Sequence, residues 1–104
     1  MADLDPVMIR FRDAVRALYG DKIERIVLYG SRGRGDARPD SDYDIAVFLK
    51  EGGSFYEETG RLSDIGVDIL FDTGAVINAL PFAEGEWRKR TGFMHEVRRE
   101  GIDL

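Results

Sequence analysis

The sequence is poor in side chains that bind soft metals or form covalent cross-links. Its 104 residues include no cysteine and a single histidine, His95. Without cysteine the chain can form neither a disulfide framework nor a thiolate metal site, and this absence slightly favours an intracellular protein. His95 has no second histidine with which to share a metal ion, and we expect it to play no catalytic role.

An excess of positive charge and long apolar runs are also missing. The net charge is −5. A domain that binds a long phosphate backbone usually carries a net positive charge. No apolar run approaches the roughly 18 residues of a membrane span, and the N-terminal segment carries acids where a signal peptide would be basic. We therefore expect a cytoplasmic protein that binds neither long nucleic acid nor a membrane, and whose anionic ligand, if any, is small.

The sequence does contain the pattern of one folded domain over residues 1–104, with 43% hydrophobic residues. Asp5 and Pro6 suit the start of a helix, and Ser54 with Glu57 forms a capping box. Periodicity predicts helices at 5–20, 54–65 and 83–100, and strands at 25–30, 44–49, 66–71 and 74–80, the last ended by Pro81. This order indicates an α+β fold in which helices flank a small mixed β-sheet.

Asp42 and Asp44 stand at the entrance of the predicted strand 44–49. Side chains at i and i+2 of a strand point to the same face about 6.5 to 7 Å apart, so these two carboxylates would lie side by side. A divalent metal is the natural counterion, because Mg²⁺ takes one or two carboxylates and leaves other positions for water and phosphate oxygens. The alternative is a solvated turn that leads into the strand.

Asp68 interrupts the apolar run of the predicted strand 66–71. An unpaired carboxylate buried there would cost several kcal/mol, so something should compensate it. If this strand neighbours strand 44–49, Asp68 joins Asp42 and Asp44 around the same metal. The alternative is an Asp68 that faces water at the sheet edge, and Asp72 replaces it if the register differs.

Gly30 and Ser31 follow the first predicted strand, where the backbone turns sharply into a short helix. The exposed amides of such a turn, together with the Ser31 hydroxyl, suit a phosphate group. The alternative is an ordinary helix cap. Arg32 and Arg34 could neutralise a polyphosphate there, or could be solvated.

The combination of Gly30-Ser31, ten intervening residues, Asp42-Tyr43-Asp44 and then Asp68 resembles the nucleotidyltransferase superfamily of DNA polymerase beta. The stretch "GSRGRGDARPDSDYDI" is most similar to the minimal nucleotidyltransferase (MNT) proteins, many of which are antitoxins paired with HEPN-domain toxins. The resemblance implies a polymerase beta-like fold over the whole chain. It covers residues 24–71 most closely.

The resemblance also implies roles for the candidate residues. Gly30 and Ser31 would hold the phosphates of ATP, and Asp42 and Asp44 would bind two Mg²⁺ ions. Asp68 would be the third carboxylate, which helps to bind the catalytic metal and to activate the attacking hydroxyl. Metal ions that clamp the attacking and leaving oxygens would leave the protein mainly to position groups and neutralise charge.

The activity implied by the resemblance is transfer of AMP from ATP to a protein hydroxyl. The expected acceptor is a tyrosine of a cognate HEPN toxin, with this chain as the antitoxin of a type VII toxin–antitoxin pair. We expect none of the extra domains with which the related enzymes hold a template or an acceptor, and so we expect the acceptor to lie on another molecule. Two alternatives remain open, an antitoxin that neutralises by binding alone and a nucleotidyltransferase that acts on a small molecule. The sequence also leaves a homo-oligomer open.

Overall fold

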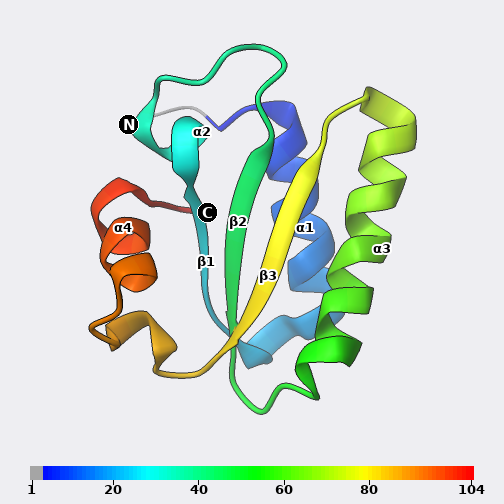
Figure 1. The fold of residues 1–104 in the computed structure, drawn as a ribbon. Helices are drawn as coiled ribbons and strands as arrows, with labels where there is room; N and C mark the ends of the chain where they lie inside the picture. The colour runs from blue at the N-terminus through cyan, green and yellow to red at the C-terminus, as the bar shows by residue number, and fades with distance from the viewer. Residues whose placement is uncertain (1–3) are drawn as a thin grey trace.

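A mixed four-stranded sheet forms the centre of the molecule in the computed structural model, which describes residues 4–104. The strands lie in the order β3 (Ile77–Ala83), β2 (Tyr43–Leu49), β1 (Ile23–Tyr29) and β4 (Ile102–Asp103) (Figure 1). β1 is antiparallel to β2 and β4, and β2 is parallel to β3. This sheet with flanking helices confirms the predicted α+β fold; residues 1–3 of the predicted domain lie outside the described residues.

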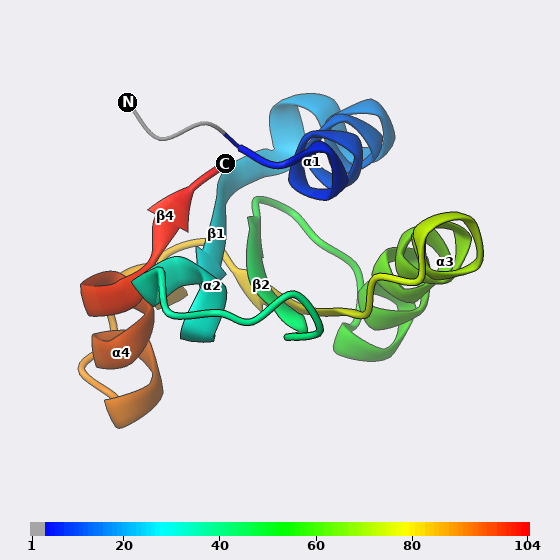
Figure 2. The ribbon, with the colours of Figure 1, turned by 90° about the horizontal axis from the view of Figure 1, so that it is seen from above.

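Two long helices cover one face of the sheet, which we call the closed face. They are α1 (Pro6–Tyr19) and α3 (Phe55–Thr73), and Figure 2 shows both on the same side of β1 and β2. α1 begins as predicted, because Asp5 Oδ1 accepts a hydrogen bond from the Met8 amide at 2.9 Å. The main core lies between the two helices and the sheet. It contains Met8, Phe11, Val15, Ile45, Val47, Leu62 and Ile69.

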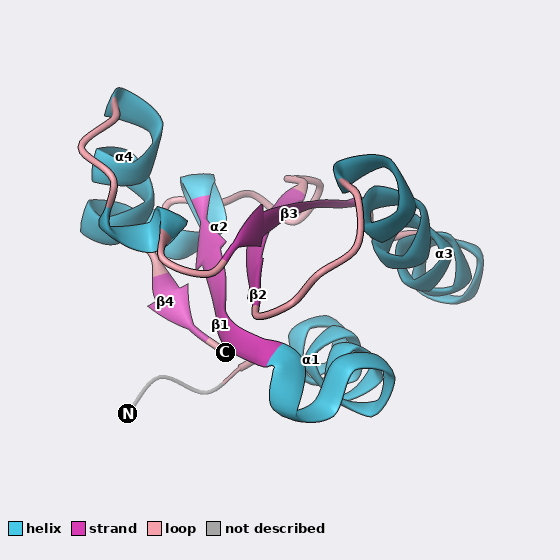
Figure 3. Cartoon of the chain, turned by 90° about the horizontal axis from the view of Figure 1, so that it is seen from below, coloured by secondary structure: helices cyan, strands magenta, loops and turns pink. Residues whose placement is uncertain are grey.

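One short helix, α4 (Gly92–Glu100), covers part of the other face, which we call the open face (Figures 2 and 3). Met94 and Val97 of α4 pack on Val27, Ala46 and Phe48. The helix predicted over 83–100 begins too early, because residues 84–91 form loops and one short 3-10 helix after β3. This 3-10 helix is η2 (Glu86–Arg88). A second 3-10 helix, η1 (Gly20–Lys22), directly follows α1.

The strand predicted at 66–71 is wrong, because these residues belong to α3. The helix begins as predicted, with the Ser54 hydroxyl accepting from the Glu57 amide at 3.1 Å, but it continues to Thr73. Its buried residues Leu62, Gly66 and Ile69 fall at helical spacing, which favours the longer helix over a strand. Within residues 4–104, no helix has the length and apolar character to cross a membrane.

The sheet's third long strand is β3, which the sequence placed at 74–80 and which runs from Ile77 to Ala83. Pro81 does not end it, contrary to the prediction. A proline lacks the amide hydrogen of a sheet ladder, but β3 is an edge strand, where one side of the backbone needs no strand partner. Pro81 lies opposite Val47 in the parallel register and is buried.

Candidate active site

Two aspartates lie at the start of β2. Asp42 directly precedes the strand and is exposed, whereas Asp44 lies within it and is half-buried. Side chains alternate along a strand, so Asp44 points away from the face occupied by Tyr43 and Ile45. Those two residues are buried in the core beneath α1 and α3. Asp44 therefore lies on the open face of the sheet.

Asn78 of β3 links the two aspartates. It lies directly opposite Asp44 in the parallel register. Its Nδ2 atom donates hydrogen bonds to Asp42 Oδ2 at 3.1 Å and to Asp44 Oδ1 at 3.4 Å. Sequence reasoning missed Asn78, although an amide that interrupts the apolar run of β3 was a signal like the one that drew attention to Asp68.

Gly30 brings the predicted phosphate-binding turn against Asp44. It opens the short helix α2 (Gly30–Arg34) with a φ of +68°, a conformation that favours glycine. A Cβ atom added to Gly30 would overlap Asp44 Oδ2, so the absence of a side chain lets the turn and the carboxylate meet. Ser31 follows immediately and is half-buried. The two halves of the predicted site are therefore adjacent.

Arg32 holds the loop between α2 and β2. Its Nη2 and Nε atoms donate to the Ser41 carbonyl at 2.9 and 3.0 Å, and Nη2 also donates to the Pro39 carbonyl at 3.2 Å. The guanidinium lies 3.8 Å from the centre of the Tyr43 ring and 4.0 Å from an oxygen of Asp5. These contacts fix the loop that carries Asp42, so the structure gives Arg32 a positioning role.

Arg34 is engaged with two acids on the surface. It pairs with Asp36 and with Glu100 of α4, each at 3.2 Å, and remains half-exposed. These pairs raise the pKa of Arg34, first through its hydrogen bond with Asp36. The predicted contact of Arg34 with a polyphosphate would require it to leave these partners.

Asp68 is not placed where the sequence predicted it. It is exposed on α3 rather than in a strand beside β2, because the run around it packs as a helix. Asp72, the substitute, lies near the end of the same helix and pairs with Arg10 of α1. Within the described residues, no three His, Cys, Asp or Glu side chains are grouped as metal ligands. The position beside Asp44 belongs to the neutral Asn78 instead.

Two tyrosines next to the site remain uncharged near neutral pH. Burial raises the pKa of Tyr43 to about 12, assisted by the hydrogen bond that its hydroxyl donates to Asp5 at 2.7 Å. Burial, followed by the negative charge of Asp44, raises the pKa of Tyr29. Neither phenol therefore adds negative charge that would repel a phosphate.

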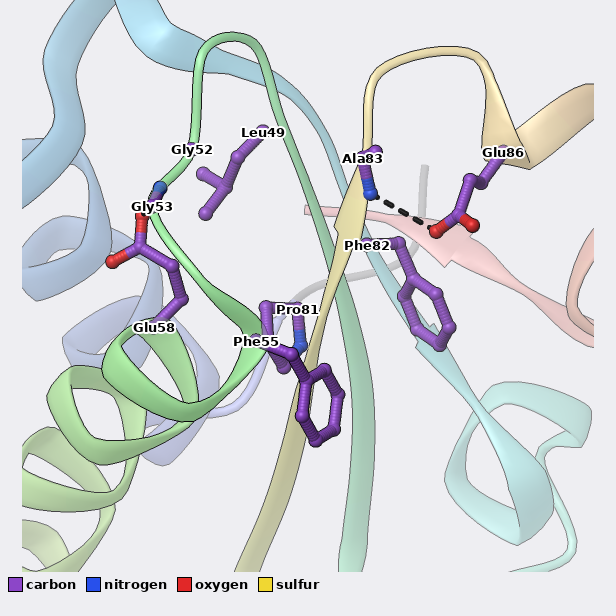
Figure 4. A pocket seen from close by; sticks show the side chains of 9 residues that line it. All are labelled: Leu49, Gly52, Gly53, Phe55, Glu58, Pro81, Phe82, Ala83 and Glu86. Carbon is purple, nitrogen blue, oxygen red and sulfur yellow. Dashed lines mark hydrogen bonds between the residues drawn. The ribbon is translucent and has the colours of Figure 1, made fainter.

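A separate cavity lies at the other end of β2, between the start of α3 and the end of β3 (Figure 4). Apolar residues and two carboxylates line it: Leu49, Phe55, Pro81, Phe82, Glu58 and Glu86. Both carboxylates have partners within the chain. Glu58 accepts from the Gly53 amide at 3.1 Å, and Glu86 accepts from the Ala83 amide at 3.0 Å. Glu58 and Glu86 thus each accept a hydrogen bond from a backbone amide. Asp42 and Asp44, in contrast, share the side-chain amide of Asn78.

The donor set at the start of β2 fits a hard divalent cation. The two carboxylates offer only oxygen ligands, and Mg²⁺ commonly binds one or two carboxylates and completes its shell with water and phosphate oxygens. The turn at Gly30 and Ser31 lies beside the same carboxylates. The arrangement can therefore bind a metal–phosphate group.

The family model described as "Nucleotidyltransferase domain" matches residues 8–99. A protein of Methanocaldococcus jannaschii named "Putative protein adenylyltransferase" is 31% identical over 93 residues, which are 88% of this chain and 87% of that protein.

Solved structures share the fold. One described as a "putative minimal nucleotidyltransferase" is 25% identical with a TM-score of 0.62, over 99% of this chain and 97% of that one. Another, a toxin–antitoxin with AMP-PNP, is 17% identical with a TM-score of 0.60, over 93% of this chain and 68% of that one. The second likeness concerns the fold alone.

Proposed function

This chain belongs to the nucleotidyltransferase domain family and is a nucleotidyltransferase enzyme, and from that premise we propose that it transfers AMP from ATP to a protein hydroxyl. The observation that carries this proposal is the contact between the Gly30 turn and the Asp42–Asp44 pair. Under this proposal the turn would bind the phosphates and the neighbouring carboxylates would bind the metal, so the two groups could act on one metal–triphosphate. The M. jannaschii relative named for protein adenylyl transfer supports the choice of AMP and of a protein acceptor.

The proposed acceptor is a tyrosine of a cognate HEPN toxin, which this chain would neutralise as an antitoxin. Two observations support a separate acceptor protein. A structural neighbour is a toxin–antitoxin complex with AMP-PNP. In addition, the carboxylate pair lies on the open face of the sheet, where Asp42 and Asn78 are exposed and a partner can approach.

In this proposal each part of the chain has a distinct task. Asp42 and Asp44 hold Mg²⁺, and the amides at Gly30 and Ser31 bind the phosphates. When bound, the metal would neutralise the charge on the triphosphate and on the leaving pyrophosphate. Asn78 orients both carboxylates through its amide group. Arg32 keeps Asp42 in place by holding the preceding loop at Ser41.

In the reaction, the acceptor oxygen bonds to the α-phosphorus of ATP while the bond to pyrophosphate breaks. Asn78 cannot take the proton of the acceptor hydroxyl, since an amide is not a base at neutral pH. That proton passes to one of the paired aspartates or to water. The role that the family resemblance implied for Asp68 is not retained, because Asp68 lies on α3.

Mass spectrometry tests the transfer. The chain is incubated with ATP, Mg²⁺ and the HEPN protein encoded next to it, and the partner is examined for one added AMP group on a tyrosine. We expect the adduct with the native chain and none with the Asp42→Asn/Asp44→Asn double variant. Absence of the adduct from the native chain, when AMP-PNP binding is retained, would reject the transfer.

One observation favours a second function, neutralisation by binding alone. Asn78 stands beside Asp44 where a third carboxylate would complete the metal site, which weakens the case for turnover. In that case the Asp42→Asn/Asp44→Asn variant would still protect cells from the toxin. Under the proposed activity the same variant folds but protects no longer.

A further inference from the structure

An aromatic cluster borders the carboxylate pair on the open face. We call Tyr29, Phe82 and Phe93 the aromatic shelf. The Phe93 ring meets Tyr29 edge-on, with centroids 5.4 Å apart, and lies 5.6 Å from Phe82. Phe82 in turn stacks on the buried Phe48 at 5.3 Å. The shelf is therefore anchored to the core beneath α4.

The strand register places one end of this shelf, Tyr29, next to Asp44. Tyr29 is paired with Asp44 across β1 and β2, and Phe82 is paired with Phe48 on β3. Side chains on one face of a strand repeat about every 7 Å. Tyr29 therefore lies directly beside Asp44, whereas Phe82 lies two same-face positions further along the strands. Phe93 packs on both rings and so bridges the distance between Tyr29 and Phe82.

Phe93 keeps an open surface although its helix packs on the sheet. The neighbouring Met94 is 4% exposed, whereas Phe93 is 40% exposed. The amide of Met94 is capped by the Thr91 hydroxyl at 3.1 Å, which fixes the start of α4 and with it Phe93. A large aromatic ring held open beside polar ligands suits a planar group of the substrate.

We propose that Phe93 supports the nucleotide base during the transfer reaction. This inference rests on the proposed function, which supplies the nucleotide. The base and the triphosphate belong to one molecule, so the base must lie close to the phosphate-binding turn. Tyr29 directly precedes Gly30 in that turn, and Phe93 packs on Tyr29. The acceptor tyrosine, which arrives on a separate protein, has no such tie to the turn.

The test compares two probes on three proteins. Isothermal titration measures the binding of AMP-PNP and of inorganic tripolyphosphate, each with Mg²⁺, to the native chain, Phe93→Leu and Phe71→Ala. Leucine fills similar space but has no aromatic face. Phe71 is the matched control, since it is an exposed aromatic residue on α3, away from the open face. Circular dichroism and thermal melting check that each variant is folded.

We expect Phe93→Leu to weaken AMP-PNP binding about five- to hundredfold, which is the range for loss of one stacked base. Tripolyphosphate binding should be unchanged in this variant, and Phe71→Ala should bind both probes like the native chain. If Phe93→Leu weakens both probes equally, or neither, the inference is overturned. A raised KM for the acceptor protein with unchanged AMP-PNP binding would assign the ring to the acceptor instead. If the native chain binds neither probe, the proposed function itself fails.

Discussion

The two faces of the sheet differ in what covers them. On the closed face, α1 and α3 bury an apolar core, and residues such as Phe11, Val15 and Leu62 are fully enclosed. On the open face, the shorter α4 leaves the start of β2 uncovered, with the aspartate pair and the aromatic shelf exposed in part. The closed face therefore supplies stability, and the open face keeps polar groups accessible for chemistry. Substitutions on the two faces should separate these effects.

The largest loss of activity should follow Gly30→Ala, a change on the open face. The added Cβ atom would overlap Asp44 Oδ2 and push the carboxylate out of place. A displacement of about 1 Å in an active site can cost about a hundredfold in rate, and we expect a loss of that size in AMP transfer. The rate of transfer at saturating ATP measures it.

Gly74→Ala is the matched control for this change. Gly74 also has a positive φ, +79°, but nothing lies within 4 Å of the added Cβ atom. Both variants should lose about 1 kcal/mol of stability from backbone strain, seen as a melting temperature lowered by about 4 to 8 °C. Only Gly30→Ala should lose activity. Equal losses of activity would show that strain, and not the overlap with Asp44, is responsible.

Glu58 provides the corresponding test on the closed face. This buried carboxylate accepts hydrogen bonds from the Tyr19 hydroxyl at 3.2 Å and from the Gly53 amide at 3.1 Å, and pairs with Arg61. We expect Glu58→Gln to lower the free energy of unfolding by about 2 kcal/mol, because the charge-assisted bonds are lost. Chemical denaturation measures the change, and the exposed Glu57→Gln is the control.

The effect of Glu58→Gln should depend on pH. Burial alone would raise the pKa of Glu58, but the bonds from Gly53, Arg61 and Tyr19 outweigh it and lower the pKa. A lowered pKa in the folded state means that the stabilisation is complete above the unfolded pKa of about 4.3 and is lost as the pH falls through the folded value. The difference between native chain and variant should therefore shrink in acid. A difference that grows in acid would contradict this reading.

A smaller effect on activity should follow Ser31→Ala. If the hydroxyl binds a phosphate of ATP, its removal should weaken nucleotide use by about 1 to 2 kcal/mol, or about five- to thirtyfold. The KM for ATP and the transfer rate measure this. Ser63→Ala on the exposed side of α3 is the control. An unchanged KM and rate would show that the Ser31 hydroxyl does not bind a phosphate and that Ser31 only forms part of the turn.

The sequence predicted the class of fold and the family because their signals are local. Strand 44–49, the turn at Gly30 and the first helix each depend on a few neighbouring residues, and all three are seen in the structure. The family match over residues 8–99 confirms the resemblance drawn from the spacing of Gly30-Ser31 and Asp42-Asp44.

The sequence failed where a decision depended on distant residues. The run 66–71 is apolar enough for a strand, and only its burial against β3, where Gly66 approaches Ile77, reveals a helix. That error predicted a strand where the chain forms part of α3, and so it misplaced Asp68. Asn78 interrupts an apolar run, but its position beside Asp44 comes from the parallel pairing of β3 with β2, which no local pattern encodes.

The smallest effect is expected from Asn78→Asp, which tests how the open face would hold the proposed metal. The change would add a third carboxylate beside Asp42 and Asp44, and two Mg²⁺ ions, as the family resemblance implies, would then have more ligands. We expect the Mg²⁺ concentration for half-maximal transfer to fall about three- to tenfold, which corresponds to roughly 0.7 to 1.4 kcal/mol. Asn78→Ala, which removes the amide without adding charge, should not lower it. If neither variant changes the dependence on Mg²⁺, then Asn78 orients the aspartates without contacting the metal, and the chain uses two carboxylates alone.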